Sequence, residues 1–254
     1  AQRMDIPALP AMATWVNLRE LGAKGDGETD DTKAIQEAID KYDNIYVPQG
    51  WYRITETLKM KPNTKLIGLH PFGTQFRLNE STAAFSGFGG PKAMVESSEG
   101  GANMLVGIGI NTGGYNYRAV GVKWMANADS YMNDVKFVGG HGGLWKPKPG
   151  VAEPRGWWER PVRISSPDNP VAASGMDLAW DNQYWSLWVT NNGGGTFKDI
   201  WTASTYATNG FYANNTSTPG RIYAMSIEHH VRNEVRFNKV SNLSLIHISE
   251  PTRL

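Results

Sequence analysis

A carboxylate and an imidazole lie two residues apart in the run 223–231, which alternates apolar with polar residues. If this run is a strand with Ile227 and His229 facing inward, Glu228 and His230 share an outer surface, because side chains alternate along a strand. A glycosidase generally uses such a carboxylate as one of an Asp/Glu pair around the scissile bond. To act as an acid near pH 6, Glu228 needs its pKa raised by roughly 2 units, and a charged His230 opposes that shift. Both are candidate catalytic residues, with Glu228 suited to base or positioning work; the alternative is an ordinary hydrogen-bonded strand carboxylate.

Tryptophan is concentrated around a long segment, 139–184, which contains several prolines and no clear strand alternation. A loop of this length is usually functional or disordered, and its aromatic content argues against disorder. Trp188 is out of phase with Leu187 and Val189, so it should point outward. Flat aromatic side chains can stack on the C–H faces of sugars, although some bury their large area only to pin a loop. The candidate substrate-binding residues are Trp145, Trp157, Trp158, Trp180, Trp185 and Trp188.

Other motifs point less clearly to chemistry. Gly140-His141-Gly142 resembles an element of polygalacturonases, but the Asp pair and the Arg-x-Lys of those enzymes are missing at suitable places. The acids of 26–37 imitate a calcium loop, yet Asp31 stands where that loop requires glycine, so helix capping is the expected role. The adjacent His229 and His230 point to opposite faces of a strand. We therefore expect no metal site and no cofactor.

One helix and many short strands must position these groups. The segment 32–42 carries apolar residues at helical spacing, and Asp30 and Asp31 stand where caps and first-turn acids belong. Short alternating runs punctuated by Gly, Asn, Pro and Thr follow it, which fits a sandwich, a barrel or a solenoid. An Asn or Thr recurs just before such runs, as in Asn133 to Phe137, and favours a solenoid of stacked coils. The runs include 45–47, 51–54, 65–67, 104–106, 120–124, 135–137, 187–189 and 211–212.

Composition narrows the classes of protein. The chain has 254 residues, 25 Lys and Arg against 24 Asp and Glu, no cysteine and 10 tryptophans. A net charge of +1 without a basic stripe argues against a nucleic-acid partner. No apolar stretch reaches the roughly 20 residues of a membrane-spanning helix. The absence of cysteine excludes disulfides and thiolate chemistry. We expect a polysaccharide partner and leave the oligomeric state open.

Both ends of the sequence differ from the rest. Residues 1–13 have no signal pattern and are interpreted as a linker from a region upstream. The domain is expected over 14–242, truncated at its C-terminal end. Residues 243–254 resemble the translation of a common sequencing adapter and are set aside from the predicted fold.

The opening of the domain resembles a known superfamily. Val16 to Thr32, with its Gly-Asp-Gly-Glu-Thr-Asp-Asp-Thr loop, is followed by the helix and by Ile45 to Gly50. This arrangement is similar to the pectate-lyase-like right-handed parallel β-helix superfamily, in which the helix caps the solenoid. The run 223–231 resembles a strand in the second β-helix of glycoside hydrolase family 55, the exo-β-1,3-glucanases, and of its bacterial relatives. The resemblance implies a further β-helix upstream and a general acid about one coil downstream of Glu228.

The sequence therefore predicts an all-β chain, a right-handed parallel β-helix with one N-terminal capping helix. The expected function is hydrolysis of β-1,3-glucan, or a similar glycan, with inversion by the full protein, which the resemblance places outside the cell or in the periplasm. This piece alone is expected to bind without turnover. The alternatives are a non-catalytic glycan-binding solenoid of the tailspike or adhesin kind, and a polygalacturonase or pectate-lyase type of enzyme acting on polyuronides.

Overall fold

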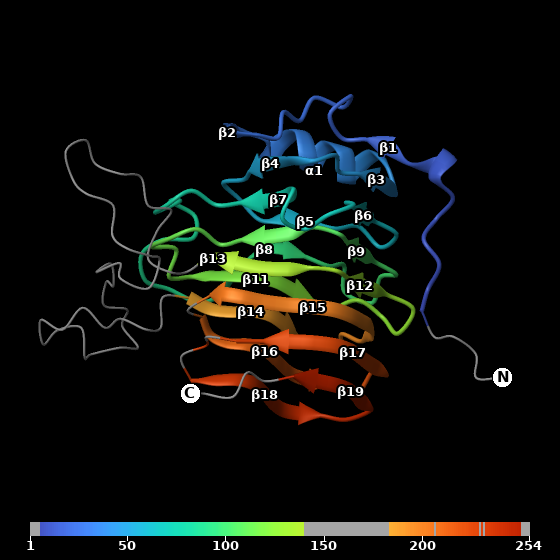
Figure 1. Ribbon diagram of the computed structural model, residues 1–254, viewed down its shortest axis with the longest axis vertical. Helices are drawn as coiled ribbons and strands as arrows, with labels where there is room; N and C mark the ends of the chain where they lie inside the picture. Colours follow the sequence, from blue (N-terminus) through green and yellow to red (C-terminus); the bar gives the residue numbers. More distant parts are fainter. Residues whose placement is uncertain (1–5, 140–182, 206, 229, 231, 250–254) are drawn as a thin grey trace, which may run out of the picture.

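The fold is a parallel β-helix of about seven turns with one α-helix at its N-terminal end (Figure 1). The computed structural model describes residues 6–139, 183–205, 207–228, 230 and 232–249. All strand pairs are parallel, and the strands form three stacks along the axis of the coil. The predicted fold class is thus confirmed. Among the described residues, no helix has the length and apolar character needed to cross a membrane.

Two of the three stacks join into one sheet. The first stack contains β1 (Val16–Asn17), β3 (Asn44–Tyr46), β6 (Lys65–Ile67), β9 (Met104–Val106) and β12 (Tyr131–Asn133). The second contains β2 (Asp26–Asp30), β4 (Gly50–Arg53), β7 (Thr74–Arg77), β10 (Gly109–Asn111) and β13 (Lys136–Gly139). The long strands β15 (Gly195–Thr205) and β17 (Gly220–Ile227) bend through the corner and extend both stacks, and β19 (Leu243–Ser249) pairs with β17.

The third stack forms a separate sheet on another side of the coil. It contains β5 (Leu58–Lys59), β8 (Lys92–Glu96), β11 (Ala119–Trp124), β14 (Gln183–Val189), β16 (Ala207–Thr216) and β18 (Asn233–Val240). A short 3₁₀ helix, η1 (Met12–Thr14), precedes β1. The strand β2 lies within the Gly-Asp-Gly-Glu-Thr-Asp-Asp-Thr segment, which the sequence predicts as a loop.

The helix α1 (Thr32–Lys41) covers the end of the solenoid with Ile35, Ala38 and Ile39, which are buried in the core. Asp31 occupies the predicted N-cap position, but its carboxylate accepts hydrogen bonds from Lys24 N at 2.7 Å and Gly25 N at 2.9 Å. Asp31 thus stands at the expected cap position, but its side chain makes no capping hydrogen bond to the helix. The carboxylate of Asp31 fixes the preceding loop instead.

Identical positions of successive coils stack inside the solenoid. One inner row runs Ile45, Leu66, Leu105, Met132, Phe197 and Ile222, and each is at most 1% exposed. A coil buries its apolar side chains only against its neighbours, so this register carries most of the hydrophobic stabilisation.

A single left-handed residue turns the chain from the first stack into the second. Asp134, Asp199 and Ala224 occupy this corner in successive coils, with φ of 50°, 52° and 54°. Such a residue interrupts the extended backbone, so it changes which of the following side chains point inward and which point outward. Phe197 and Ile200 are consequently both buried although they are three residues apart.

The predicted boundary after Asn242 does not coincide with a break in the fold. Leu243–Ser249 forms β19, with Leu245 opposite Ile222. Apolar and polar residues alternate over much of 243–249, as in a strand, so this segment can pair with β17. The origin of this tail stays a prediction.

Candidate functional site

Side chains that point away from the core of the second stack lie on one side of the coil, called here the Trp51 face; Gln75 and Asn111, in its middle, are only 7% exposed. One row of this face runs Trp51, Gln75, Gly109, Lys136, Trp201 and Ser226 in register. The next row begins Arg53, Arg77 and Asn111. Two hollows lie on this face, one at each end of the described rows, and they define the candidate site.

The hollow nearer the C-terminal end has a volume of about 430 Å³ and contains Glu228. The Trp201 indole N–H donates to Glu228 Oε1 at 2.5 Å, and the Glu228 backbone N–H lies 3.3 Å from Thr202 O. The indole therefore fixes the direction of the carboxylate on the outer surface. The lining residues are Lys136, Asp199, Ile200, Trp201, Ala224, Met225, Ser226 and Glu228.

Charged groups in this hollow are held by neighbours. The Lys136 side chain is 16% exposed, and its ammonium group lies 3.1 Å from Asp134 Oδ1 and donates to Asp199 O at 3.1 Å. The Asp199 carboxylate forms an ion pair with Lys198, and this hydrogen bond raises the pKa of the Lys198 ammonium group. Lys136 also lies over the Trp201 ring at 5.9 Å. The hollow thus combines an oriented carboxylate, a second carboxylate and a fixed cation beside an aromatic ring.

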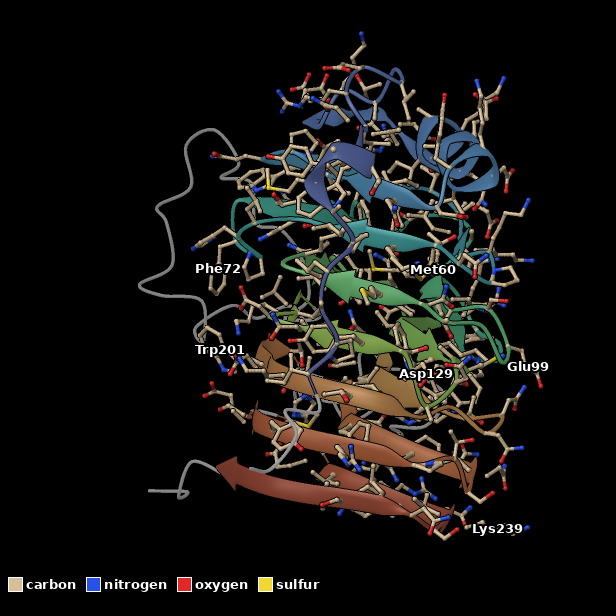
Figure 2. All side chains as sticks on the ribbon, turned by 90° about the vertical axis from the view of Figure 1, so that its right-hand side faces the viewer. Met60, Phe72, Glu99, Asp129, Trp201 and Lys239 are labelled. Atoms are coloured by element: carbon tan, nitrogen blue, oxygen red, sulfur yellow. The ribbon has the colours of Figure 1, made fainter. Side chains whose placement is uncertain are left out.

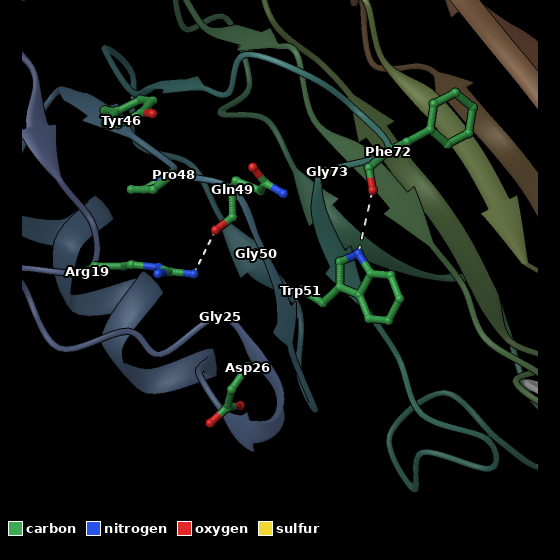
Figure 3. A pocket seen from close by; sticks show the side chains of 10 residues that line it. All are labelled: Arg19, Gly25, Asp26, Tyr46, Pro48, Gln49, Gly50, Trp51, Phe72 and Gly73. Atoms are coloured by element: carbon green, nitrogen blue, oxygen red, sulfur yellow. Dashed lines mark hydrogen bonds between the residues drawn. The ribbon is translucent and has the colours of Figure 1, made fainter.

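The second hollow, of about 800 Å³, lies at the N-terminal end of the same face (Figure 3). Trp51 is 49% exposed there, and its indole N–H donates to Phe72 O at 3.5 Å. Arg19 closes another side of the hollow by donating to Gln49 O at 2.6 Å. The residues that line this hollow are Arg19, Gly25, Asp26, Tyr46, Pro48, Gln49, Gly50, Trp51, Phe72 and Gly73.

Phe72 links the two hollows. Its ring is 43% exposed and packs edge-on against the Trp201 ring at 5.7 Å, and Figure 2 places both residues on one side of the molecule. The loop that carries Phe72 passes directly over Gly109, since a Cβ at Gly109 would lie 2.1 Å from Pro71 O. Trp51, Phe72 and Trp201 therefore form a spaced aromatic series that ends at Glu228.

His230 does not share the outer surface with Glu228, so that expectation is wrong. The His230 side chain is 0% exposed, and its ring contacts Glu234 Oε2 at 2.6 Å and Thr205 Oγ1 at 2.9 Å. The strand β17 ends at Ile227, so the two-residue period on which the expectation depended no longer applies at position 230. His230 belongs to a buried polar network, and Ser186 Oγ lies 3.5 Å from its Nε2.

Trp185 and Trp188 lie on the outer side of the third stack, called here the Trp188 face. Trp188 points outward as its phase predicts, while Leu187 and Val189 are buried. One row of this face runs Lys59, Glu96, Lys123, Trp188, Tyr212 and Arg236 in register. These two tryptophans are therefore on a different stack from Glu228. The remaining predicted tryptophans, Trp145, Trp157, Trp158 and Trp180, lie outside the described residues, as does the Gly-His-Gly motif.

The aromatic side chains of the Trp188 face pack on one another. The Trp185 ring lies 4.8 Å from that of Trp188 and 4.6 Å from that of Tyr212. Lys123 covers Trp188 at 5.0 Å, and Arg236 covers Tyr212 at 5.0 Å. The Trp188 indole N–H donates to Asn214 Oδ1 at 2.7 Å. Neighbouring side chains thus occupy much of the ring surface of this cluster.

Sequence reasoning missed Trp51, Trp201, Phe72 and Asp199. Trp51 is out of phase with the buried Tyr52, the same signal that identified Trp188, so it was detectable. Asp199 is the left-handed corner residue and Trp201 follows it, so the phase of the strand cannot be read there from a two-residue period. Phe72 lies in a loop, and nothing in the sequence indicates that this loop crosses two coils.

The acids that imitate a calcium loop make local turns. Asp26 accepts hydrogen bonds from Thr29 N at 2.7 Å and Glu28 N at 2.9 Å, and these bonds, led by that from the Thr29 backbone, lower the pKa of Asp26 to about 2. Asp30 Oδ1 accepts from Thr32 N at 3.0 Å. Within the described part of the chain, no three His, Cys, Asp or Glu side chains are grouped to hold a metal ion.

The fold and the site define a pectate-lyase-like β-helix related to carbohydrate-acting proteins. The sequence matches the family "Rhamnogalacturonase A/epimerase, pectate lyase-like" over residues 15–220, and the chain belongs to this family.

Shorter similarities connect the chain to named proteins. It is 46% identical over 57 residues to a protein of Arthroderma benhamiae named "Probable glucan endo-1,3-beta-glucosidase", and 43% identical over 53 residues to the preneck appendage protein of Bacillus phage PZA. Each alignment covers 21% of this chain and 6% of the relative. A crystal structure from Parabacteroides merdae ATCC 43184, assigned by its name to the glycosyl hydrolases, superposes with a TM-score of 0.57 at 13% identity, covering 94% of this chain and 98% of the other. That likeness concerns the fold alone.

Proposed function

We propose that this chain is part of a glycoside hydrolase that cleaves β-1,3-glucan, or a similar glycan, with inversion, and that the Trp51 face binds the glycan. The observation that carries the proposal is the outward carboxylate of Glu228, which Trp201 holds at 2.5 Å inside a hollow of about 430 Å³. Because the proposed substrate is a polysaccharide, we also propose that the protein acts outside the cell or in the periplasm.

In an inverting mechanism, one carboxylate removes a proton from the attacking water while a carboxylic acid protonates the departing glycosidic oxygen. The indole N–H of Trp201 donates to Glu228 Oε1 and fixes the direction of this carboxylate. Glu228 thus suits the base role. Asp199 is not assigned the acid role, because its carboxylate is engaged in an ion pair with Lys198. The general acid that the family 55 resemblance implies, about one coil further along, lies outside the described residues.

The aromatic series supports binding of an extended chain. Trp51 and Phe72 each expose more than two fifths of their surface, and they continue the line from Trp201 along the axis. Exposed rings of this size supply apolar area that matches the C–H faces of sugars.

A binding titration tests the proposal on this chain. We expect laminarin, a β-1,3-glucan, to bind measurably, and we expect Trp201→Ala to weaken it about tenfold, or 1.4 kcal/mol. A chain extended through the following coil should release reducing sugar with inverted configuration, detected by NMR.

In that extended chain, Glu228→Gln should reduce turnover by two or more orders of magnitude, since proton transfer contributes about 10²- to 10⁴-fold. The matched control is Glu96→Gln on the Trp188 face. If laminarin is untouched and polygalacturonate yields unsaturated products, the hydrolytic mechanism is wrong and the polyuronide alternative replaces it.

A non-catalytic glycan-binding solenoid is the second candidate. The phage appendage similarity and the aromatic series favour it, because neither requires a reacting carboxylate. Laminarin binding that persists without turnover in the extended chain would establish this alternative.

A further inference from the structure

Arg77 is a cation with little to neutralise it on the Trp51 face. Its guanidinium lies 4.3 Å over the Trp51 ring, and its Nε is buried without a hydrogen-bond partner in the described chain. Its neighbours in the row are Arg53 on one side and the amide of Asn111 on the other. Burial lowers the pKa of Arg77, so the folded chain holds this charge at a cost.

Arg53 is better compensated than Arg77. The Nε of Arg53 is likewise buried without a hydrogen-bond partner in the described chain, but its Nη1 donates to Glu28 O at 2.9 Å, and Asp30 is its register partner on β2. Burial raises the pKa of Asp30, but hydrogen bonds from Thr32 and Thr55, and after them the positive charge of Arg53, lower it below its ordinary value. Two guanidinium groups on neighbouring rungs repel each other, so an anion that pairs with Arg77 relieves this repulsion.

The two ends of the face carry different charged groups. Asp26 lines the N-terminal hollow, but Arg53 and Arg77 lie in the adjacent row. Glu228 and Asp199, in contrast, line the hollow at the other end, where Lys136 is already paired with Asp134. From β7 to β17 the stack rises four rungs, or about 19 Å at roughly 4.8 Å per rung. An anionic sugar would be repelled beside Glu228 and attracted beside Arg77.

We propose that the Trp51 face selects a glycan that is uncharged where it meets Glu228 and carries a carboxylate or sulfate group about 19 Å away, at Arg77. Trp51 stacks on the sugar that bears this group, and Arg77 pairs with its anion. The proposal deepens the function proposed above, because it assumes that a glycan lies along this face.

The test compares three β-1,3-glucans with one backbone: laminarin, carboxymethylated laminarin and sulfated laminarin, titrated against the 254-residue chain by calorimetry. We expect at least one charged glucan to bind about tenfold more tightly than laminarin at low salt, and 0.5 M salt should reduce this ratio because exposed charges are screened. The better of the two charged glucans identifies the anion. Arg77→Gln should bring the ratio close to one, and Arg77→Lys should keep part of it.

Arg236→Gln is the matched control, because Arg236 also covers an aromatic ring but lies on the Trp188 face. Equal binding of all three glucans by the unaltered chain overturns the proposal, and so does a ratio that survives in Arg77→Gln. If laminarin itself does not bind, the proposed function fails separately, and polygalacturonate then tests the subsite. Binding of polygalacturonate that Arg77→Gln abolishes supports the anion subsite, whereas absent or unaltered binding refutes it.

Discussion

The Trp51 face and the Trp188 face are built from the same residue types but in opposite arrangements. Each carries tryptophan and a basic side chain that lies over an aromatic ring, Arg77 on one face and Lys123 on the other. On the Trp188 face the rings lie within 5 Å of each other, and cations cover the two ends of the cluster. On the Trp51 face the rings lie in different coils along the axis, two of them are more than 40% exposed, and a hollow lies at each end of the series, although Phe72 and Trp201 touch edge-on at 5.7 Å.

This contrast teaches that the number of tryptophans does not locate a binding surface. A ring whose faces are covered by neighbours stabilises the sheet, whereas a ring with an open face retains area for a ligand. The spacing between the rings decides whether a ring face stays open for a ligand. This spacing depends on the coil in which each ring lies. The following predictions test this difference.

The largest expected difference concerns stability. Trp188→Ala should lower the free energy of unfolding by about 2–3 kcal/mol, because it removes a partly buried ring and leaves Asn214 Oδ1 without the indole donor. Trp51→Ala should cost less than about 1 kcal/mol, since the ring is 49% exposed. Urea denaturation of both variants measures the two values. Equal losses would remove the distinction between the faces.

A glycine substitution tests the path of the Phe72 loop. Gly109→Ala places a Cβ 2.1 Å from Pro71 O, so the loop must shift, and we expect about 2 kcal/mol of destabilisation with weaker laminarin binding. Gly90→Ala is the control, since nothing lies within 4 Å of the added Cβ. Thermal unfolding and calorimetry report the two effects, and an unaltered Gly109→Ala protein would contradict the close approach.

The affinity for laminarin should fall about tenfold for a change on the Trp51 face but little for a change on the Trp188 face. Trp201→Ala should weaken laminarin binding to that extent, about 1.4 kcal/mol, while Trp188→Ala, measured under conditions where it remains folded, should change it by less than twofold. Affinity electrophoresis in laminarin gels compares the variants side by side. A larger loss of laminarin affinity in Trp188→Ala than in Trp201→Ala would identify Trp188 as the sugar-binding tryptophan. The candidate binding surface would then lie on the third stack.

The smallest effect concerns the loop between β10 and β11. Burial, assisted by Tyr115, raises the pKa of Tyr117 to about 12, above its ordinary value of 10. The folded state therefore keeps this proton longer than the unfolded state, so its contribution to stability is complete below pH 10 and is lost between pH 10 and 12.

The variant Tyr117→Phe sharpens this test. The Tyr117 hydroxyl is buried without a hydrogen-bond partner in the described chain, so its removal should be neutral or slightly stabilising at pH 7. It should also make the loss of stability above pH 10 shallower, as followed by urea midpoints across that range. An unchanged alkaline profile would show that Tyr117 does not cause the loss.

Local sequence was a good guide wherever a strand stayed regular. The run 65–67 coincides with β6, the helix expected over 32–42 ends one residue earlier, and Trp188 points outward as its phase predicts. The two-residue alternation failed beyond the end of β17, where it predicted that His230 lies on the surface. A period of two holds only while the backbone remains extended, so it cannot be carried past a strand end or a left-handed corner.

The sequence by itself determined the solenoid, because the apolar period, the turn residues and the opening Gly-Asp-Gly loop all act over a few residues. It also identified Glu228 as a surface carboxylate. Only the tertiary structure decided which groups accompany Glu228. Trp201 lies 27 residues earlier in the chain and Phe72 lies in a loop several coils away, and stacking of the coils brings both to one face. The register between coils depends on the packing of all interior side chains together. A pattern of a few neighbouring residues in the sequence cannot specify it.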